Sequence, residues 1–167
     1  MCKLIIFTIA LYLPTMTKQI ETVKKIRALL LEGIKDLTTE QLNKIPAGFN
    51  NNIIWNLGHL IAAQQGICYK RAGATPLISD DFWEKFKPGS KPEVTVEAAE
   101  IENIKSLFLS LIDQLEIDCD TLVFNNYTAV TTRYGIELAS INDGINFLPF
   151  HEGLHSGTIM ALKRLVL

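Results

Sequence analysis

The sequence contains few cysteines, and their arrangement argues against a disulfide framework. Cys2, Cys68 and Cys119 are the three cysteines among 167 residues, an odd number with no C-x-x-C pair. Chains held together by disulfides usually carry more cysteines, in even numbers. We therefore expect a cytoplasmic protein whose stability comes from a hydrophobic core, which a chain of this length can bury as one domain.

The sequence also lacks a concentration of charge and a long apolar run. Its 16 Lys and Arg residues and 18 Asp and Glu residues are interspersed, with a formal net charge of −2. A nucleic-acid-binding protein normally carries a basic stripe, so we expect no nucleic-acid partner. The apolar run Leu4–Leu13 is far shorter than the roughly 20 residues that span a membrane, so we expect no membrane span.

Residues 1–15 differ from the rest of the chain. Their apolar run resembles the core of a secretory signal, but Pro14 and Thr15 follow in place of an Ala-x-Ala cleavage site. Met16 opens an amphipathic stretch. We interpret residues 1–15 as an N-terminal extension, either a mis-assigned start or a short apolar helix or strand, with export as a third reading. A single domain is expected at residues 16–167.

Apolar residues recur at spacings of three and four in four long segments, which predicts four amphipathic helices. These helices are expected at residues 17–36, 51–72, 95–118 and from 140 to near the C-terminus, with Thr95 and Ser140 as caps. Short helices are expected after the capping box Thr38-x-x-Gln41 and, capped by Ser79, at residues 80–86. The pattern describes an all-α four-helix bundle.

The connections between these helices are less regular. Residues 75–93 are expected to cross an end of the bundle. Residues 119–138 have extended propensities at Leu122–Phe124 and turns at Asn125-Asn126 and Gly135, which fits a small hairpin or an ordered loop.

The three histidines of the chain all lie on core-facing helical stripes. His151 and His155 are four residues apart, so they project from one face of the last helix. His59 lies on the second long helix, beside small residues that leave space in front of it. Three imidazoles leave a position open on a divalent metal, which is the pattern of a catalytic site. Hydrogen-bonded core histidines are the alternative.

His151 to His155 also reads as the H-E-x-x-H signature of zinc proteases, in which the glutamate is the general base. The downstream third ligand of those proteases is missing here, and Thr158 stands where the metzincin pattern has glycine. We therefore discount a protease. Glu152 is retained as a candidate catalytic residue that handles a proton, with a solvated or salt-bridged surface glutamate as the alternative.

Four further residues are candidates for substrate contact: Asn52, Trp55, Tyr127 and Arg133. Trp55 lies on the His59 face and can equally be a core residue, and Asn52 can line a pocket mouth or cap its helix. Tyr127 and Arg133 lie, with Tyr134, in the irregular segment before the last helix, and loops beside a site often contact substrate. Surface residues are the alternative for these.

Two segments of the chain resemble a known family. Trp55-Asn56-Leu57-Gly58-His59-Leu60 resembles the W-x-x-x-H-[LI] segment of the DinB-like (DinB/YfiT) superfamily, and residues 151–157 resemble its H-x-x-x-H-x-G segment. The likeness runs from about residue 17 to the end of the chain. It implies a bundle of up-down-down-up connectivity, commonly a homodimer, with a divalent metal on His59, His151 and His155.

The resemblance also implies a range of activities. The family includes thiol-dependent S-transferases and isomerases, and other members are described only as metal-dependent hydrolases. We therefore expect an enzyme that activates a low-molecular-weight thiol towards a small electrophile, with a hydrolase or a non-catalytic metal-binding or dimerisation protein as alternatives. Zinc, nickel, iron(II) and manganese all accept imidazole ligands, so the metal is left open.

Overall fold

The computed structural model describes residues 2–121, 124 and 126–167, and the side chains of these from residue 18 onward. Its elements, in chain order, are α1 (Cys2–Ile34), α2 (Thr39–Asn43), α3 (Ile53–Gln64), the π-helical turn η1 (Gln65–Tyr69), the 3-10 turn η2 (Lys70–Ala72), α4 (Asp80–Phe86), α5 (Ala98–Asp120), β1 (Val130–Thr131), β2 (Glu137–Leu138) and α6 (Ile141–Val166).

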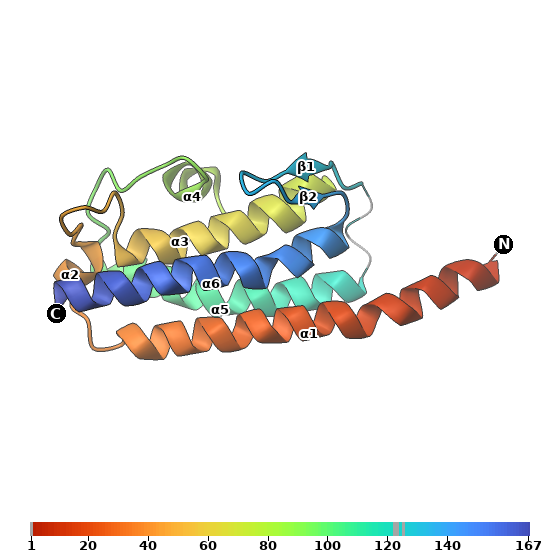
Figure 1. Ribbon diagram of the computed structural model, residues 1–167, viewed down its shortest axis with the longest axis horizontal. Helices are drawn as coiled ribbons and strands as arrows, with labels where there is room; N and C mark the ends of the chain where they lie inside the picture. The colour runs from red at the N-terminus through yellow and green to blue at the C-terminus, as the bar shows by residue number, and fades with distance from the viewer. Residues whose placement is uncertain (1, 122–123, 125) are drawn as a thin grey trace.

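Four long helices form the expected all-α bundle (Figure 1). Helices α1 and α3 each pack against both α5 and α6, so α1 and α3 lie diagonally opposite each other. In Figure 1, α3 and α5 run in the direction opposite to α1 and α6. This is the up-down-down-up connectivity that the family resemblance implies. It makes α3 and α6 neighbours that run antiparallel.

The connection between α3 and α5 differs from the expectation. Because these two helices are parallel, the chain must return along the length of the bundle before α5 begins. Helix α4 lies in this connection and packs against α3 (Figure 1). The prediction that residues 75–93 cross an end of the bundle is therefore wrong. Helix α4 in this connection covers the outer side of α3.

The expected caps are confirmed at three of the helices. Thr38 and Gln41 form the capping box of α2, and the hydroxyls of Ser79 and Ser140 accept hydrogen bonds at the starts of α4 and α6. The prediction that Thr95 caps the next helix is wrong, because α5 begins at Ala98.

The later start of α5 has a local cause. The amide side chain of Asn43 accepts a hydrogen bond from the Val96 backbone N–H and donates one to the Val96 carbonyl, at 2.8 and 2.9 Å. These two bonds occupy both backbone groups of Val96 and hold it beside α2. The chain can therefore turn into a helix only after this residue.

The second long helix also differs in detail from the expectation. The helix expected at residues 51–72 is α-helical only to Gln64, and η1 and η2 replace its final turns before Gly73, which ends it as expected at a φ of 68°. The antiparallel pairing of β1 and β2 confirms the small hairpin. Leu122, Val123 and Asn125, part of the expected extended and turn segments, lie outside the described residues.

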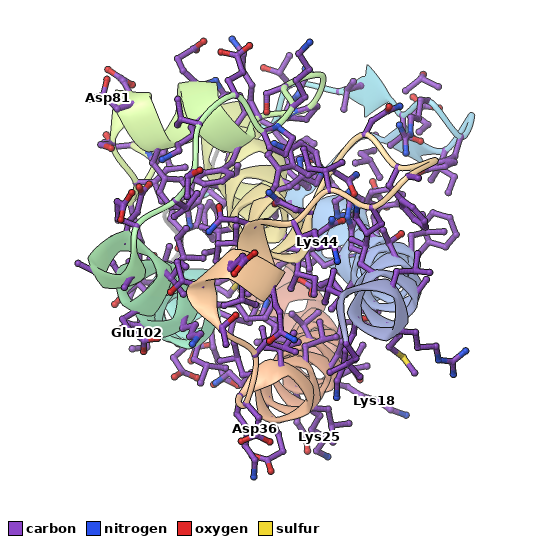
Figure 2. All side chains as sticks on the ribbon, turned by 90° about the vertical axis from the view of Figure 1, so that its left-hand side faces the viewer. Lys18, Lys25, Asp36, Lys44, Asp81 and Glu102 are labelled. Atoms are coloured by element: carbon purple, nitrogen blue, oxygen red, sulfur yellow. The ribbon has the colours of Figure 1, made fainter. Side chains whose placement is uncertain are left out.

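Two clusters of buried apolar side chains make up the core. One is centred on Leu30, Ile53, Phe108 and Ile159, and the other on Val23, Cys68, Ile112, Leu115 and Ile145. Charged side chains such as Lys25, Asp36, Asp81 and Glu102 point outward from the bundle (Figure 2). No helix among the described residues is both long enough and apolar enough to cross a membrane.

Candidate metal centre

His59 on α3 meets His151 and His155 on α6 inside the bundle. One ring nitrogen of each histidine lies within 4.8 Å of the other two. The ring of His59 is centred 4.7 Å from that of His155 and 5.4 Å from that of His151. The two antiparallel helices therefore bring together residues that are far apart in sequence, and the expected convergence of the three histidines is confirmed.

Hydrogen bonds fix the orientation of two of these rings. Nδ1 of His59 lies 2.9 Å from the carbonyl oxygen of Phe86, and Nδ1 of His155 lies 2.7 Å from Oδ1 of Asn56. Both oxygens can only accept, so each Nδ1 carries the hydrogen and each Nε2 keeps its lone pair. Metal-binding histidines are commonly held in this way by a second hydrogen-bond acceptor.

Asn56 is a residue of the site that sequence reasoning missed. Its side chain is fully buried, and its Nδ2 donates to the carbonyl oxygen of Asn52 at 2.7 Å and to Oδ1 of Asn51 at 3.1 Å. Because Nδ2 of Asn56 faces these two acceptors, its Oδ1 faces His155. The sequence contained a signal for this role, since Asn56 lies three residues before His59 and so on the same helical face.

The contact between Phe86 and His59 depends on a glycine. A Cβ atom built on Gly58 would lie 2.5–2.7 Å from the ring of Phe86. Only a residue without a side chain lets α4 pack this closely on α3, which places the Phe86 carbonyl at His59. On the other side of His59, the Trp55 ring is stacked at 4.8 Å with an interplanar angle of 11°.

The three histidines are held in their neutral form. Burial lowers the pKa of His151 to about 3 and that of His155 to about 4, and it also lowers the pKa of His59. The positive charge of Arg133, which lines the same cavity as the histidines, also lowers the pKa of all three. Neutral imidazoles are the form that binds metal ions.

The histidines line a cavity of about 690 Å³ between α3, α6 and the hairpin. This volume is in the range of small-molecule and cofactor sites. Both tryptophans of the chain, Trp55 and Trp83, lie in its wall, with Phe147 and Tyr134. A site with three convergent imidazoles and aromatic walls can hold a metal ion and an organic ligand side by side.

Comparison with known families identifies the superfamily of the chain. The sequence model of the DinB superfamily matches residues 22–159, which is most of the chain and includes all three histidines. The chain belongs to the DinB superfamily. A search of curated proteins gave no match, so the family is the level at which the comparisons describe this protein.

In this DinB-superfamily protein, the four expected substrate-contact residues divide into two pairs. Trp55 and Arg133 line the cavity. Asn52 instead caps α3, accepting a hydrogen bond from the Trp55 N–H at 2.8 Å, which confirms the capping alternative. Tyr127 lies outside the cavity wall, and its hydroxyl is buried near Gly144, where burial raises its pKa to about 12.

Glu152 lies in the core, beside the cavity but not in its wall. The residue is 1% exposed, and its carboxylate pairs with the buried guanidinium of Arg27 on α1 at 2.7 Å, so the surface alternative is wrong although the salt bridge is real. Burial raises the pKa of the Glu152 carboxyl, and the charge of Arg27 partly opposes this rise. The histidine cluster therefore lies next to a buried ion pair in the chain, because His151 directly precedes Glu152.

Lys70 and Arg71 also line the cavity and were not predicted from the sequence. A signal existed for Lys70, because His59, Ala63, Gly66 and Lys70 follow one another at spacings of four, three and four. The turns η1 and η2 place both cationic residues at the end of this stripe. The chemistry of the cavity thus extends beyond the histidines along α3.

Proposed function

We propose that this DinB-superfamily protein is a metal-dependent enzyme that transfers a low-molecular-weight thiol to a small electrophile. His59, His151 and His155 would hold one divalent metal at the inner end of the cavity, and both reactants would bind in the cavity beside it. The observation that carries the proposal is the set of three neutral imidazoles, two of which have their Nδ1–H groups already bound.

The residues present fit a metal ion. Two nitrogens bound to one tetrahedral metal at about 2.1 Å are about 3.4 Å apart, a separation that side-chain rotations reach from the observed cluster. An ion bound to three neutral imidazoles retains positive charge and an open position, where it lowers the pKa of a bound thiol or water. The donor set suits zinc, nickel, iron(II) or manganese.

The remaining residues of the site prepare the reactants. The Trp55 ring stacks on His59 and closes one side of the histidine group, while Phe147 supplies apolar wall near His151 at a ring distance of 5.9 Å. The charge of Arg133 favours a thiolate over a neutral thiol. The thiol proton leaves to solvent, the sulfur bonds to the electrophilic carbon, and the leaving group departs with the electron pair of the broken bond.

Glu152 acts in this proposal through the position of α6. Both hydrogen bonds from Arg27 go to one carboxylate oxygen of Glu152, Oε1. His151 directly precedes Glu152 in the chain. We therefore favour a positioning role, and the proton-handling role expected from the sequence stays a prediction.

Metal content and thiol-dependent turnover test the proposal. Protein purified without a histidine tag is expected to contain about one divalent metal per chain. His59→Ala is expected to lose it, and Lys163→Gln on another face is expected to keep it. With metal, wild-type protein is expected to join mercaptoethanol to chlorodinitrobenzene, and His59→Ala is expected not to.

Each other outcome identifies a rival function. Turnover of ester or amide substrates without any thiol would assign a metal-dependent hydrolase to the same site. Stoichiometric metal without turnover of either class would support a non-catalytic metal-binding protein. Absence of metal after supplementation with all four candidate ions would overturn the proposal.

A homodimer and a cytoplasmic location are further expectations from the sequence. Sedimentation equilibrium of the full chain tests the first, with a mass of about twice 18.7 kDa expected for the dimer. Fractionation of the producing cells tests the second.

A further inference from the structure

The cavity wall contains cationic side chains and no carboxylate. Lys70, Arg71 and Arg133 line it, and none of the described lining residues is Asp or Glu. The chain as a whole has more acidic than basic residues, 18 against 16. The charge of the cavity therefore differs in sign from the charge of the protein.

Within the described part of the chain, no acidic side chain forms a salt bridge with any of these three residues. The ammonium of Lys70 lies 3.8 Å from the centre of the Trp83 ring, and Nη2 of Arg133 donates to the Tyr134 hydroxyl at 2.6 Å. Both contacts orient the cationic group without neutralising it. The positive charge in the cavity is thus left for a ligand to balance.

The cationic groups are distributed along the cavity. Arg133 lines the same cavity as the three histidines. Lys70 and Arg71 line the cavity from the turn η2, which follows α3 and η1. Ala63 and Gly66, with little or no side chain, also line the wall. One ligand in this cavity can therefore contact both the histidines and the cationic residues.

We propose that the cavity selects a small organic anion, whose carboxylate or phosphate group binds to one or more of Arg133, Arg71 and Lys70 and whose uncharged part packs against Trp83 and Phe147. As a statement about substrate, it rests on the proposed enzymatic function and identifies the thiol or the electrophile as anionic. As a statement about binding, it depends only on the cavity wall and can be tested without metal.

The test compares three ligands of the same shape and different charge. Phenylpropionate, phenylpropanol and phenylpropylamine are titrated into chelator-treated and metal-loaded protein near neutral pH, by calorimetry and by tryptophan fluorescence. Both tryptophans line the cavity, so a fluorescence change reports binding there. The acid is expected to bind about tenfold or more tightly than the alcohol in both forms, as for hydrogen bonds to charged groups, and the amine least.

Variants locate the charge preference. The double variant Arg71→Gln/Arg133→Gln is expected to bind the acid no more tightly than the alcohol. Arg164→Gln removes one arginine from a groove between α1 and α6 and is expected to retain the preference. Circular dichroism confirms that each variant is folded.

The inference is overturned if the amine binds as tightly as the acid, if the double variant keeps the full preference, or if none of the three ligands changes the fluorescence. These outcomes can be distinguished from a failure of the proposed function. Anion preference in a protein that never binds metal would remove the enzyme proposal alone. Metal binding with no preference for the acid would remove this inference alone.

Discussion

Arg27 on α1 and Glu152 on α6 form an ion pair in the centre of the bundle. Nε and Nη2 of Arg27 donate to the same Glu152 oxygen at 2.9 and 2.7 Å, while Nη1 donates to Gln64 on α3 and to the Phe108 carbonyl on α5, each at 2.9 Å. One guanidinium on α1 therefore contacts the other three long helices. Because His151 directly precedes Glu152, the pair also sets the rotation of α6 at the histidines.

Removing one member of this pair is expected to destabilise the protein more than removing both. Arg27→Met leaves a buried carboxylate without its partner, which typically costs about 3–5 kcal/mol of unfolding free energy. The double variant Arg27→Met/Glu152→Met removes both charges and is expected to recover much of this loss. Urea denaturation measures both. Equal losses in the single and double variants would show that the pair contributes little.

Asn56→Leu is expected to weaken metal binding about 10–100-fold, because His155 loses the acceptor that orients it. Asn56→Asp keeps an acceptor and is expected to bind metal more tightly than Asn56→Leu. Asn52→Ala is the control: it removes the cap of α3, at a typical cost of about 1 kcal/mol, and is expected to leave metal affinity unchanged. Competition with a chromophoric chelator measures the affinities, and equal weakening in all three variants would contradict the assigned role.

Gly58→Ala is expected to destabilise the protein by about 1–3 kcal/mol and to weaken metal binding. The added methyl would meet the rigid Phe86 ring at 2.5–2.7 Å and displace α4, whose last residue holds His59 through its carbonyl. Gly153→Ala, on α6 with open space around it, is expected to be neutral or stabilising by up to about 1 kcal/mol. Thermal unfolding distinguishes the two, and a neutral Gly58→Ala would show that α4 can shift without loss.

Metal-free protein is expected to lose stability as the pH falls. The folded-state pKa values of His151 and His155, about 3 and about 4, lie below the ordinary value of 6.5. Between these values the unfolded chain binds more protons than the folded one, so this contribution is complete above about 6.5 and is lost as the pH approaches 4 and then 3.

Urea denaturation at a series of pH values measures this dependence. His151→Leu removes the more strongly shifted of the two groups and is expected to flatten the profile over that range. A profile with the same slope in wild type and variant would mean that this histidine is not buried in neutral form.

The sequence predicted the parts of the fold that depend on local patterns. Thr38, Ser79 and Ser140 cap helices as expected, because a cap is made by residues three apart. The Thr95 prediction was wrong because a distant residue, Asn43, holds Val96. Local patterns do not contain contacts of this kind.

The same distinction applies to the site. The spacing of the histidines predicted their shared face, and the family resemblance added their ligand role. Glu152 was misplaced because a helix packed on two neighbours buries two faces, and the face about 100° from His151 meets Arg27. Lys70 and Arg71 were missed because the irregular turns η1 and η2 decide where their side chains lie.

His59 and His151 are 92 positions apart in the chain, and the intervening segment contains α4, α5 and the hairpin. Any ion that both residues ligate closes this segment into a ring, and the entropy that such a closure removes from the unfolded chain grows with ring size. The ion would then act as a reversible crosslink between the second and last long helices of the bundle. Metal supply and resistance to unfolding would rise and fall together.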